Sequence, residues 1–550
     1  MTQHVTDAVP TDASPAASGR REWWRDAVIY QVYPRSFADG NGDGMGDLPG
    51  IRSRLPYLKK LGVDAVWLSP FYASPQADAG YDVADYRAVD PMFGTLTDAD
   101  DLVRDAHALG LKVIVDVVPN HCSDQHEWFK QALREGPGSP LRERFHFRPG
   151  KGVDGELPPN DWESIFGGPA WTRVADGEWY LHLFAPEQPD FNWDHPAVHD
   201  EFRSILRFWL DLGVDGFRID VAHGLVKAPG LPDIGHEEQV KLLGTEAMPY
   251  FDQDGVHEIY RGWRRILDEY QGSERIAVAE AWTPTVERSA LYVRPDELHQ
   301  AFNFSYLTTE WDAAGLRDVI DRSLSAVNAV SAPATWVLSN HDVVRHVTRL
   351  ADGDEAHGLR RARAATLLML ALPGSAYLYQ GEELGLPEVV DLPDEVRQDP
   401  AFFRSSGQDG TRDGCRVPLP WSGQEPPFGF GPVPGGPSWL PQPADWKHLT
   451  VEAQEGDPTS TLEFYRSALA VRREHPALGA GREITWLETP KGVLAFRRDT
   501  AEGSFVCTVN LTAAPVVVPT PGTLLLASAD VQPGAASTEL PADCTIWWAV

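Results

Sequence analysis

The sequence predicts an α/β protein: a (β/α)8 TIM barrel with an inserted subdomain after the third strand and a C-terminal β-sandwich domain. Three observations support this fold class. Apolar, β-branched runs of strand length alternate with amphipathic helical stretches from Trp23 onward. Eight such runs occur before the alternation stops. Four of these runs end in polar residues able to act as acids, bases or nucleophiles, as the strand ends of barrel enzymes do.

The order of the elements predicts a parallel sheet. A strand followed by a helix and a second strand forms a parallel unit, because the helix returns the chain to the same end of the sheet. The predicted strands lie at 27–34, 63–70, 111–121, 214–220, 275–282, 299–304, 334–342 and 375–385. The helical stretches with the clearest pattern lie at 49–62, 98–110, 202–213, 260–270 and 359–374. Eight parallel strands are the number that closes such a barrel.

Two breaks in this alternation predict additional parts. Between residues 122 and 186, Gly, Pro, Trp and short β-like pieces indicate a subdomain inserted after the third strand. Between 386 and 446, Pro, Gly and aromatic residues indicate a long ordered loop over the mouth of the eighth strand. After a helix at 459–476, short apolar runs separated by turns predict the β-sandwich. The predicted domains are a disordered tail at 1–21, a barrel at 22–121 and 187–478, an inserted domain at 122–186 and a C-terminal domain at 479–550.

Composition limits the classes of partner. The 550 residues carry a net charge of −32, which argues against binding of nucleic acid or an anionic membrane surface. The four cysteines are far apart and show neither CxxC nor Cys/His metal spacing, so we expect no disulfide framework. Residues 1–21 lack an apolar core, and no later run has about 18 uncharged apolar residues. We therefore expect a cytoplasmic enzyme with a small or neutral partner, whose oligomeric state the sequence leaves open.

Carboxylates at the strand ends are the main chemical signal. In GFRID, at 216–220, strand alternation places Arg218 and Asp220 on the same face, and the Arg favours the ionised form that a nucleophile needs. Glu280 follows an apolar strand, where burial would raise its pKa, as a general acid requires. Asp342 is a third carboxylate at a strand end. Two carboxylates of opposite protonation state describe glycoside hydrolysis, and a separation of about 5 Å would mean retention of configuration.

A single Asp or Glu at a strand end is more often a helix cap or a salt-bridge partner than a catalytic residue. The four motifs together support the catalytic interpretation. Four segments resemble, in order, the four short regions of the α-amylase superfamily, glycoside hydrolase family 13: DVVPNH (116–121), GFRID (216–220), VAEAW (278–282) and VLSNHD (337–342). QPDFNW, at 188–193, resembles the fifth region. The resemblance covers nearly all of 23–550 and implies a retaining mechanism. The roles that it implies are nucleophile for Asp220, acid/base for Glu280, transition-state stabiliser for Asp342, and sugar binding for His121, Gln188, Arg218 and His341.

Within this superfamily the chain is most similar to the α-glucosidase and oligo-1,6-glucosidase branch. DAGYD resembles a segment in which an Asp binds the terminal glucose and a Tyr stacks under it, which maps to Asp78 and Tyr81. RDGCRVPLPW resembles the segment that supplies an Arg opposite this Asp; Arg412 is the first candidate and Arg416 the second. The resemblance implies a pocket closed at the non-reducing end, and therefore exo action. An ordinary loop salt bridge is the alternative for Arg412.

Three further residues map to the sugar-binding region of that branch. Phe166 and Phe184 fall where the branch has aromatic pocket walls, and core packing is the alternative for each. The residue after the nucleophile tracks the preferred linkage in the branch, and here it is Val221, which is associated with α-1,6 bonds. The following AHGL differs from the INF or INH common there, so the linkage stays open.

The predicted activity is release of glucose from short α-glucosides such as maltose, isomaltose and maltooligosaccharides, with sucrose as a further candidate and glucosyl transfer as a side reaction. The alternatives are a trehalose synthase, sucrose isomerase or glucosyltransferase of the same superfamily. A more distant alternative is a non-catalytic scaffold that resembles the heavy chains of amino-acid transporters.

The segment DGNGDGMGD is a candidate cation loop. Its side-chain oxygens occur at alternating positions, and its glycines permit a tight wrap, as in EF-hand loops. The twelfth position, where an EF-hand has Glu, is Gly50. The resemblance implies that the loop binds a structural Ca²⁺ or Mg²⁺, and a metal-free turn is the alternative. The implied ligands are the side chains of Asp39, Asn41, Asp43 and Asp47 and the carbonyl of Met45.

Overall fold

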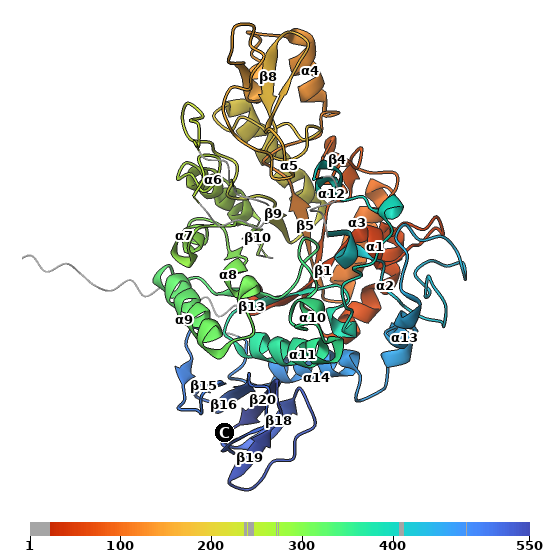
Figure 1. The fold of residues 1–550 in the computed structure, drawn as a ribbon, viewed down its shortest axis with the longest axis vertical. Coiled ribbons are helices and arrows are strands. Elements are labelled where there is room, and N and C mark those ends of the chain that lie inside the picture. The colour runs from red at the N-terminus through yellow and green to blue at the C-terminus, as the bar shows by residue number, and fades with distance from the viewer. Residues whose placement is uncertain are drawn as a thin grey trace, which may run out of the picture.

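The structure is a computed structural model that describes residues 22–235, 239, 247–270, 272, 274–405, 412–479 and 481–550. The predicted tail at 1–21 lies outside the described residues. A barrel occupies the middle of the molecule, a subdomain carrying α4 and β8 projects from one end, and the C-terminal strands pack at the other end (Figure 1). Within the described part of the chain, no helix has the length and apolar character needed to cross a bilayer.

Eight parallel strands form the barrel sheet, which confirms the predicted fold class. They pair in the order β11-β10-β9-β5-β2-β1-β13-β12. At the two ends of this order, the N–H of Asn303 donates to the carbonyl of Thr335 at 3.1 Å, so the sheet is nearly closed. The strands are β1 (Val28–Val32), β2 (Ala65–Leu68), β5 (Lys112–Val117), β9 (Gly216–Ile219), β10 (Ile276–Ala279), β11 (Gln300–Ala301), β12 (Thr335–Val337) and β13 (Ser375–Tyr379).

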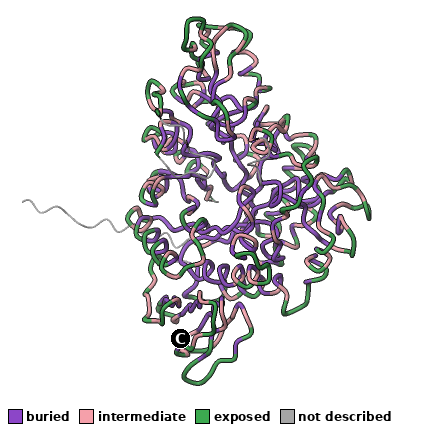
Figure 2. The backbone as a smooth tube through the Cα atoms, viewed as in Figure 1, coloured by how far each residue is buried: buried purple, intermediate pink, exposed green. Residues whose placement is uncertain are grey.

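Helices cover the outside of the barrel. Because side chains fill the barrel interior and helices cover its exterior, residues of the strands are buried on both faces, as the central purple region of Figure 2 shows. Local signals define the helix ends: Thr95 and Asp98 form a capping box before α3, and Gly62 ends α2 with a left-handed φ of 103°. The helices are α2 (Leu48–Leu61), α3 (Leu96–Ala108), α5 (Pro196–Leu212), α6 (Val256–Glu269), α7 (Val286–Leu291), α8 (Phe304–Thr308), α9 (Ala313–Ala329), α10 (His346–Arg349) and α11 (Glu355–Ala371).

The segment between β5 and α5 forms the projecting subdomain. Its antiparallel sheet has the order β6-β8-β7, and a β-bridge between His121 and Asp190 holds its first and last residues together at the carboxyl end of β5. The subdomain therefore stands beside the mouth of the barrel. Its elements are α4 (Glu127–Glu135), η2 (Arg142–Arg144), β6 (Phe147–Pro149), β7 (Trp171–Arg173) and β8 (Glu178–Leu181).

A long loop follows β13 and reaches this subdomain, because Arg404 Nε donates to the carbonyl of Gly167 at 3.0 Å. The elements of the loop are η3 (Glu382–Leu384), η4 (Asp394–Val396), α12 (Pro400–Arg404), η5 (Arg412–Arg416), η6 (Ala444–His448) and α13 (Val451–Gln454). Shorter elements elsewhere are η1 (Trp23–Arg25), α1 (Pro34–Phe37), β3 (Tyr72–Ala73) and β4 (Asp85–Val89).

The C-terminal domain is antiparallel, in agreement with the predicted β-sandwich. After α14 (Thr461–Glu474), five strands pair in the order β14-β15-β16-β20-β18, and β17 pairs with β19. The strands are β14 (Thr485–Trp486), β15 (Val493–Thr500), β16 (Gly503–Asn510), β17 (Val516–Pro519), β18 (Thr523–Ala527), β19 (Ser537–Leu540) and β20 (Cys544–Ala549). Trp547 Nε1 of β20 donates to the carbonyl of Leu367 at 3.1 Å, which joins the domain to α11 of the barrel.

Candidate active site

Two of the predicted carboxylates follow neighbouring barrel strands directly. The N–H of Asp220 donates to the carbonyl of Val117 at 2.9 Å, and that of Glu280 to the carbonyl of Ile219 at 3.0 Å. These bonds continue the ladders β5-β9 and β9-β10 by one residue, so the positions of both residues are set by the sheet itself. Both side chains are at most about a tenth exposed, at the carboxyl end of the barrel where TIM-barrel chemistry takes place.

One guanidinium joins these two carboxylates. Arg218 Nη1 lies 2.5 Å from Asp220 Oδ1, and Arg218 Nη2 lies 3.3 Å from Glu280 Oε2. Arg218 Nη1 is also 2.8 Å from Asp116 Oδ1. The side chain of Arg218 is 2% exposed, so its positive charge serves three carboxylates in a nearly dry environment.

Burial controls the protonation of this pair. Burial raises the pKa of Glu280 to about 7, although Arg218 and the N–H of Val221 oppose the shift. Burial also raises the pKa of Asp220; Arg218 opposes this, and the charges of Glu280 and Asp116 add to it. Arg218 acts in the predicted direction, towards the ionised form of Asp220, but burial and two like charges outweigh this one cation. Asp220 has the shorter contact to Arg218, at 2.5 Å against 3.3 Å for Glu280, which favours Asp220 as the charged member of the pair.

A strained peptide fixes Glu280. Val221 has φ 44°, a left-handed conformation that is a genuine outlier for a β-branched residue and costs about 1–3 kcal/mol. This conformation accompanies a 2.7 Å hydrogen bond from the N–H of Val221 to Glu280 Oε2, while Trp282 Nε1 donates to Glu280 Oε1 at 2.9 Å. A Cβ at Gly224 would lie 2.7 Å from Val221 Cγ1, so this loop requires glycine there. Both oxygens of Glu280 are thus held in place.

The pKa of Glu280 predicts the alkaline limit of activity. A general acid works only while protonated, so the rate should fall about tenfold per pH unit above about pH 7 as Glu280 ionises. The sign follows from the raised pKa: the proton is bound below this value and lost above it. The measurement is kcat/KM for maltose, whose leaving group needs a proton, across the pH range. A profile that stays flat to about pH 9 would contradict the assignment of Glu280 as the acid.

Asp342 is the third carboxylate, five residues after β12. Its Oδ1 lies 2.9 Å from Arg416 Nη2 and 3.2 Å from Arg412 Nη1, and its Oδ2 lies 3.3 Å from His341 Nε2. Burial alone would raise the pKa of Asp342, but His341 and the two arginines hold it well below its usual range. Asp342 is therefore an anion, and its pKa shifts in the direction opposite to that of Glu280.

The structure distinguishes the two candidate arginines. Arg412 Nη2 lies 3.1 Å from Asp78 Oδ1, whereas Arg416 contacts Asp342 and donates to the carbonyl of His341 at 2.8 Å. Arg412 is therefore the residue opposite Asp78. Sequence reasoning missed Asp399, which binds Arg412 through Nε at 2.9 Å and Nη2 at 2.8 Å and lies in a loop without a recognisable motif.

Tyr81 and His341 form a stacked pair beside these carboxylates. Their ring centroids are 5.3 Å apart with an interplanar angle of 7°, and Tyr81 Oη lies 2.7 Å from His341 Nε2. Tyr81 Oη also donates to Asp116 Oδ2 at 3.2 Å. No role was predicted for Asp116, the first residue of DVVPNH. An Asp inside an apolar strand could have indicated a buried functional carboxylate. Burial raises the pKa of Asp116 to about 6, against the lowering effect of Arg218.

The remaining predicted sugar-binding residues gather on the side of the projecting subdomain. Gln188 Nε2 lies 3.1 Å from His121 Nε2 and donates to Asp78 Oδ2 at 3.2 Å. The ring of Phe184 lies 5.0 Å from His121 and 5.5 Å from Phe166. All of the predicted catalytic and sugar-binding residues are thus linked to this one site by contacts between side chains or, for Val221, through its peptide.

A family model described as the catalytic domain of alpha-amylase matches residues 31–481. The chain belongs to the alpha-amylase family. It is 40% identical over 512 residues to a protein of Rhizobium meliloti (strain 1021) named "Probable alpha-glucosidase", covering 89% of this chain and 90% of the relative. It is 35% identical over 523 residues to the oligo-1,6-glucosidase of Parageobacillus thermoglucosidasius, covering 89% and 90%.

Among solved structures, this alpha-amylase family member is similar to XgtA, an α-glucosyl transfer enzyme. The two share 37% sequence identity and superpose with a TM-score of 0.87, covering 96% of this chain and 100% of the other. Barrel, projecting subdomain and C-terminal strands therefore belong to one shared architecture.

Loop residues after the nucleophile differ from the branch pattern of the alpha-amylase family, and the structure shows their packing. The ring of His223 is buried against Phe251, with centroids 4.2 Å apart. Phe251 belongs to the same apolar cluster as Val221, Phe166 and Phe184. The AHGL segment thus packs next to the predicted sugar-binding side chains.

The predicted cation loop of this family member is a turn rich in oxygen atoms. Asp39 Oδ1 and Asp43 Oδ1 accept hydrogen bonds from N–H groups of the loop, such as that of Met45 to Asp43 at 2.8 Å. Burial raises the pKa of Asp47, its backbone hydrogen bonds oppose the shift, and the charges of Asp39 and Asp43 add to it. Oxygen donors that repel one another fit Ca²⁺ or Mg²⁺. Among the described residues, no three His, Cys, Asp or Glu side chains are arranged to hold a metal, so a cation here would also need Asn41 and the Met45 carbonyl.

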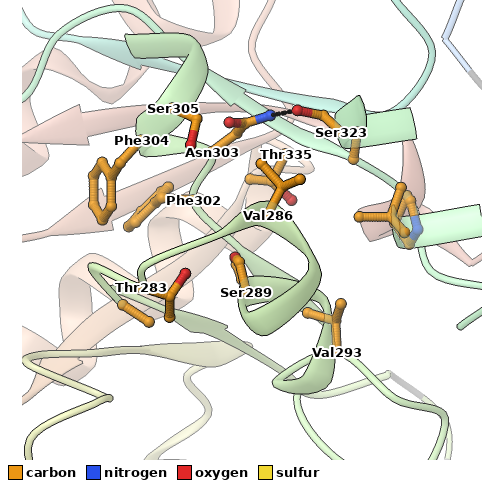
Figure 3. A pocket seen from close by; sticks show the side chains of 15 residues that line it. Thr283, Val286, Ser289, Val293, Phe302, Asn303, Phe304, Ser305, Ser323 and Thr335 are labelled. Atoms are coloured by element: carbon orange, nitrogen blue, oxygen red, sulfur yellow. Dashed lines mark hydrogen bonds between the residues drawn. The ribbon is translucent and has the colours of Figure 1, made fainter. Parts of the chain in front are cut away.

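A small cavity lies between the segment after Glu280, the strands β11 and β12, and the helices α7, α8 and α9 (Figure 3). Its volume is about 40 Å³, and its lining includes Thr283, Ser289 and Thr335, with Asn303 donating to Ser323 Oγ at 2.7 Å. This volume suits one or a few water molecules and is too small for a sugar ring. Asp220, Glu280 and Asp342 are not among its lining residues, so the cavity is separate from the site of the carboxylates.

Proposed function

We propose that this protein is a retaining, exo-acting α-glucosidase that releases α-glucose from the non-reducing ends of short α-glucosides. The observation that carries the proposal is the single guanidinium of Arg218 between two buried carboxyl groups, those of Asp220 and Glu280, with the shorter contact to Asp220 and a raised pKa at Glu280. One charged and one protonated carboxyl on either side of a glycosidic bond are the requirements of glycoside hydrolysis. The names of the relatives support α-glucosides as substrates.

Each residue then has a defined task. Glu280 donates its proton to the glycosidic oxygen while Asp220 attacks the anomeric carbon, which breaks the bond and forms a covalent glucosyl-enzyme. Glu280, now ionised, takes a proton from water, and this water attacks the anomeric carbon and frees Asp220. Two inversions at that carbon give net retention. The anionic Asp342 stabilises the positive charge that develops on the sugar ring in both steps.

The ion pair between Asp78 and Arg412 supports exo action. Its atoms are 3.1 Å apart, and Arg412 also lies 3.2 Å from Asp342, so a charged wall stands next to the catalytic carboxylates. A single terminal glucose can hydrogen-bond to this wall, whereas a longer chain extending beyond it would have to break the pair. Phe166, whose ring lies 5.0 Å from the Arg412 guanidinium, continues this wall on the apolar side.

Product analysis tests the proposal. Purified protein should release free α-glucose from maltose or isomaltose, and the ratio of the two rates should decide the linkage preference that Val221 leaves open. The initial anomer, followed by NMR, should be α. Absence of glucose from maltose, isomaltose and a nitrophenyl α-glucoside would refute the proposal, and initial β-glucose would refute retention.

Glucosyl transfer is a second candidate function, favoured by the 0.87 TM-score to an α-glucosyl transfer enzyme. It needs the same covalent intermediate, with a sugar or alcohol hydroxyl in place of water as the acceptor. A sucrose or trehalose isomerase would return the glucosyl group to the released sugar. Rearranged disaccharide with little free glucose, from sucrose or trehalose, would identify the isomerase. New oligosaccharides that increase with acceptor concentration would identify transfer.

We also propose that the loop of Asp39, Asn41, Asp43, Met45 and Asp47 binds a structural Ca²⁺ or Mg²⁺. A cation that binds only the folded protein stabilises it by mass action, so EDTA should lower Tm by several degrees. Asp43→Asn should show the same lower Tm, and EDTA should cause no further change in this variant. If EDTA changes neither Tm nor the metal content of the native protein, the loop is a metal-free turn.

We also propose that the protein is cytoplasmic and that its partners are small neutral sugars. All four cysteines are free and buried, which supports the reducing cytoplasm. The net charge of −32 supports small neutral sugars as partners over nucleic acid or anionic membranes.

A further inference from the structure

The ring of His121 lies between two side-chain amides. Its Nδ1 is 3.1 Å from Asn120 Nδ2, and its Nε2 is 3.1 Å from Gln188 Nε2. The ring is 1% exposed. A neutral imidazole has one N–H and one lone pair, so it can accept a hydrogen bond from only one of these amides. The choice decides whether His121 presents a donor or an acceptor on its Nε2 side, where Gln188 and Asp78 lie.

Other donors fix the orientation of both amides. Asn120 Oδ1 accepts from Lys227 Nζ at 2.8 Å, and because an ammonium group only donates, the Asn120 NH2 must face the ring. Gln188 Oε1 accepts from the backbone N–H of Ala185 at 3.0 Å, so its NH2 also faces the ring. The placement of N and O in both amides therefore follows from the hydrogen-bond network.

His121 is neutral in this setting. Burial lowers the pKa of His121 to about 4; the charge of Lys227 also lowers it, while Asp190 and the backbone of Tyr81 oppose the shift. The ring thus carries one proton around neutral pH, and this proton sits on one of two nitrogens.

Lys227 makes Asn120 the stronger of the two donors. The side chain of Lys227 is 1% exposed, and its Nζ lies 2.8 Å from Asp190 Oδ2 and also bonds the carbonyl of Gly224. A cation that binds the amide oxygen polarises the amide and strengthens its N–H as a donor. The oxygen of Gln188 accepts only from a neutral peptide N–H, so its amide is less polarised. The lone pair of the ring is therefore best placed on Nδ1, against Asn120.

We propose that Lys227 and Asn120 are positioning residues that hold His121 in its Nε2–H tautomer. Nε2 of His121 and Nε2 of Gln188 are then two donors 3.1 Å apart, and Gln188 Nε2 also donates to Asp78 Oδ2 at 3.2 Å. An oxygen of the bound glucosyl group accepts a hydrogen bond from His121 Nε2, a step that rests on the proposed glucosidase function. Lys227 also donates to the carbonyl of Gly224, four residues after Asp220. The loop that follows the nucleophile therefore helps to determine which nitrogen of His121 donates a hydrogen bond to the sugar.

Asn120→Asp tests the proposal with little change in volume. The new carboxylate can still bind Lys227, but it loses the 3.2 Å hydrogen bond from Asn120 Nδ2 to Asp190 Oδ2, so Tm and circular dichroism check that the variant folds. The carboxylate accepts a hydrogen bond from Nδ1 and cannot donate one. His121 should therefore switch to the Nδ1–H tautomer, and kcat/KM on maltose should fall about 10- to 100-fold, the effect of losing one buried hydrogen bond and leaving its partner unpaired.

The tautomer is read directly by ¹⁵N NMR of protein labelled at histidine. The His121 signals are assigned by their absence in His121→Gln. The native protein without sugar should show a protonated Nε2 and an unprotonated Nδ1, and Asn120→Asp should show the reverse. The matched control is Asn328→Asp, on α9 at the other end of the barrel, where Nδ2 only donates to the carbonyl of Arg482. It should change neither the His121 signals nor kcat/KM.

Two results would overturn the proposal: a native His121 with its proton on Nδ1, or an Asn120→Asp protein with an unchanged tautomer. Lys227→Met provides a second variant, in which the freed amide should let both tautomers appear. The NMR result does not depend on turnover. An Nε2–H signal in a protein that releases no glucose would refute the glucosidase function and leave the tautomer assignment standing.

Discussion

Replacement of Asp220 by Asn is expected to reduce kcat for maltose by about 10⁴-fold or more, because no glucosyl-enzyme can form without the attacking carboxylate. Arg218 would lose its 2.5 Å partner but would keep Asp116 and Glu280, so the protein should fold. The measurement is glucose release, with Tm and circular dichroism as checks of folding.

A surface substitution of the same chemistry is the control for this prediction. Asp200→Asn in α5 removes a carboxylate that is 74% exposed and paired, among the described residues, with nearby Arg203, so activity should stay within twofold. Azide offers a sharper test: with Asp220→Gly, it should attack the anomeric carbon directly and give β-glucosyl azide. Native-like turnover in a folded Asp220→Asn protein would exclude Asp220 as the nucleophile.

Replacement of Glu280 by Gln is expected to lower kcat/KM for maltose by about 10³-fold, the usual contribution of a general acid. The loss should be much smaller for a nitrophenyl α-glucoside, because a nitrophenolate leaves without a proton. The alkaline fall near pH 7 should also vanish, since the group that causes it is gone. The measurement is kcat/KM for both substrates across the pH range.

Glu258→Gln in α6 is the matched control, because this carboxylate is 76% exposed and pairs with Arg261 on its own helix. It should leave both substrates and the pH profile unaffected. Equal losses for maltose and the nitrophenyl glucoside in Glu280→Gln would assign Glu280 a role in binding and exclude it as the acid. An unchanged alkaline fall would assign that pH dependence to another group.

The barrel was predictable because its signals are local. Each strand is an apolar run, each helix has an amphipathic face, and their alternation implies parallel strands. The prediction of eight strands is confirmed, including β11, which has only two residues and was predicted from HQAFNF. The exact ends of the strands were harder to predict from the sequence, because they depend on hydrogen bonds to neighbouring strands.

The site was predictable wherever a residue sits at a strand end in a motif. Asp220, Glu280, Asp342, His121 and His341 all follow strands, and the structure brings them to one end of the barrel. Asp399 escaped sequence reasoning because it lies in a loop with no motif, and its role becomes visible only through its two bonds to Arg412. The choice of Arg412 over Arg416 also needed contacts across the fold, since Asp78 is 334 positions away in the chain.

By itself the sequence determined the fold class, the family and the candidate carboxylates, because apolar periodicity and strand-end motifs depend only on residues that are close together in the chain. Only the tertiary structure decided the direction of the pKa shifts of Asp220 and Glu280, the partner of Asp78, the left-handed peptide of Val221 and the amides around His121. The reason is physical. The pKa of a group depends on its burial and on every charge near it in space, so Arg218, two positions from Asp220, could not reveal how strongly burial and Glu280 oppose it.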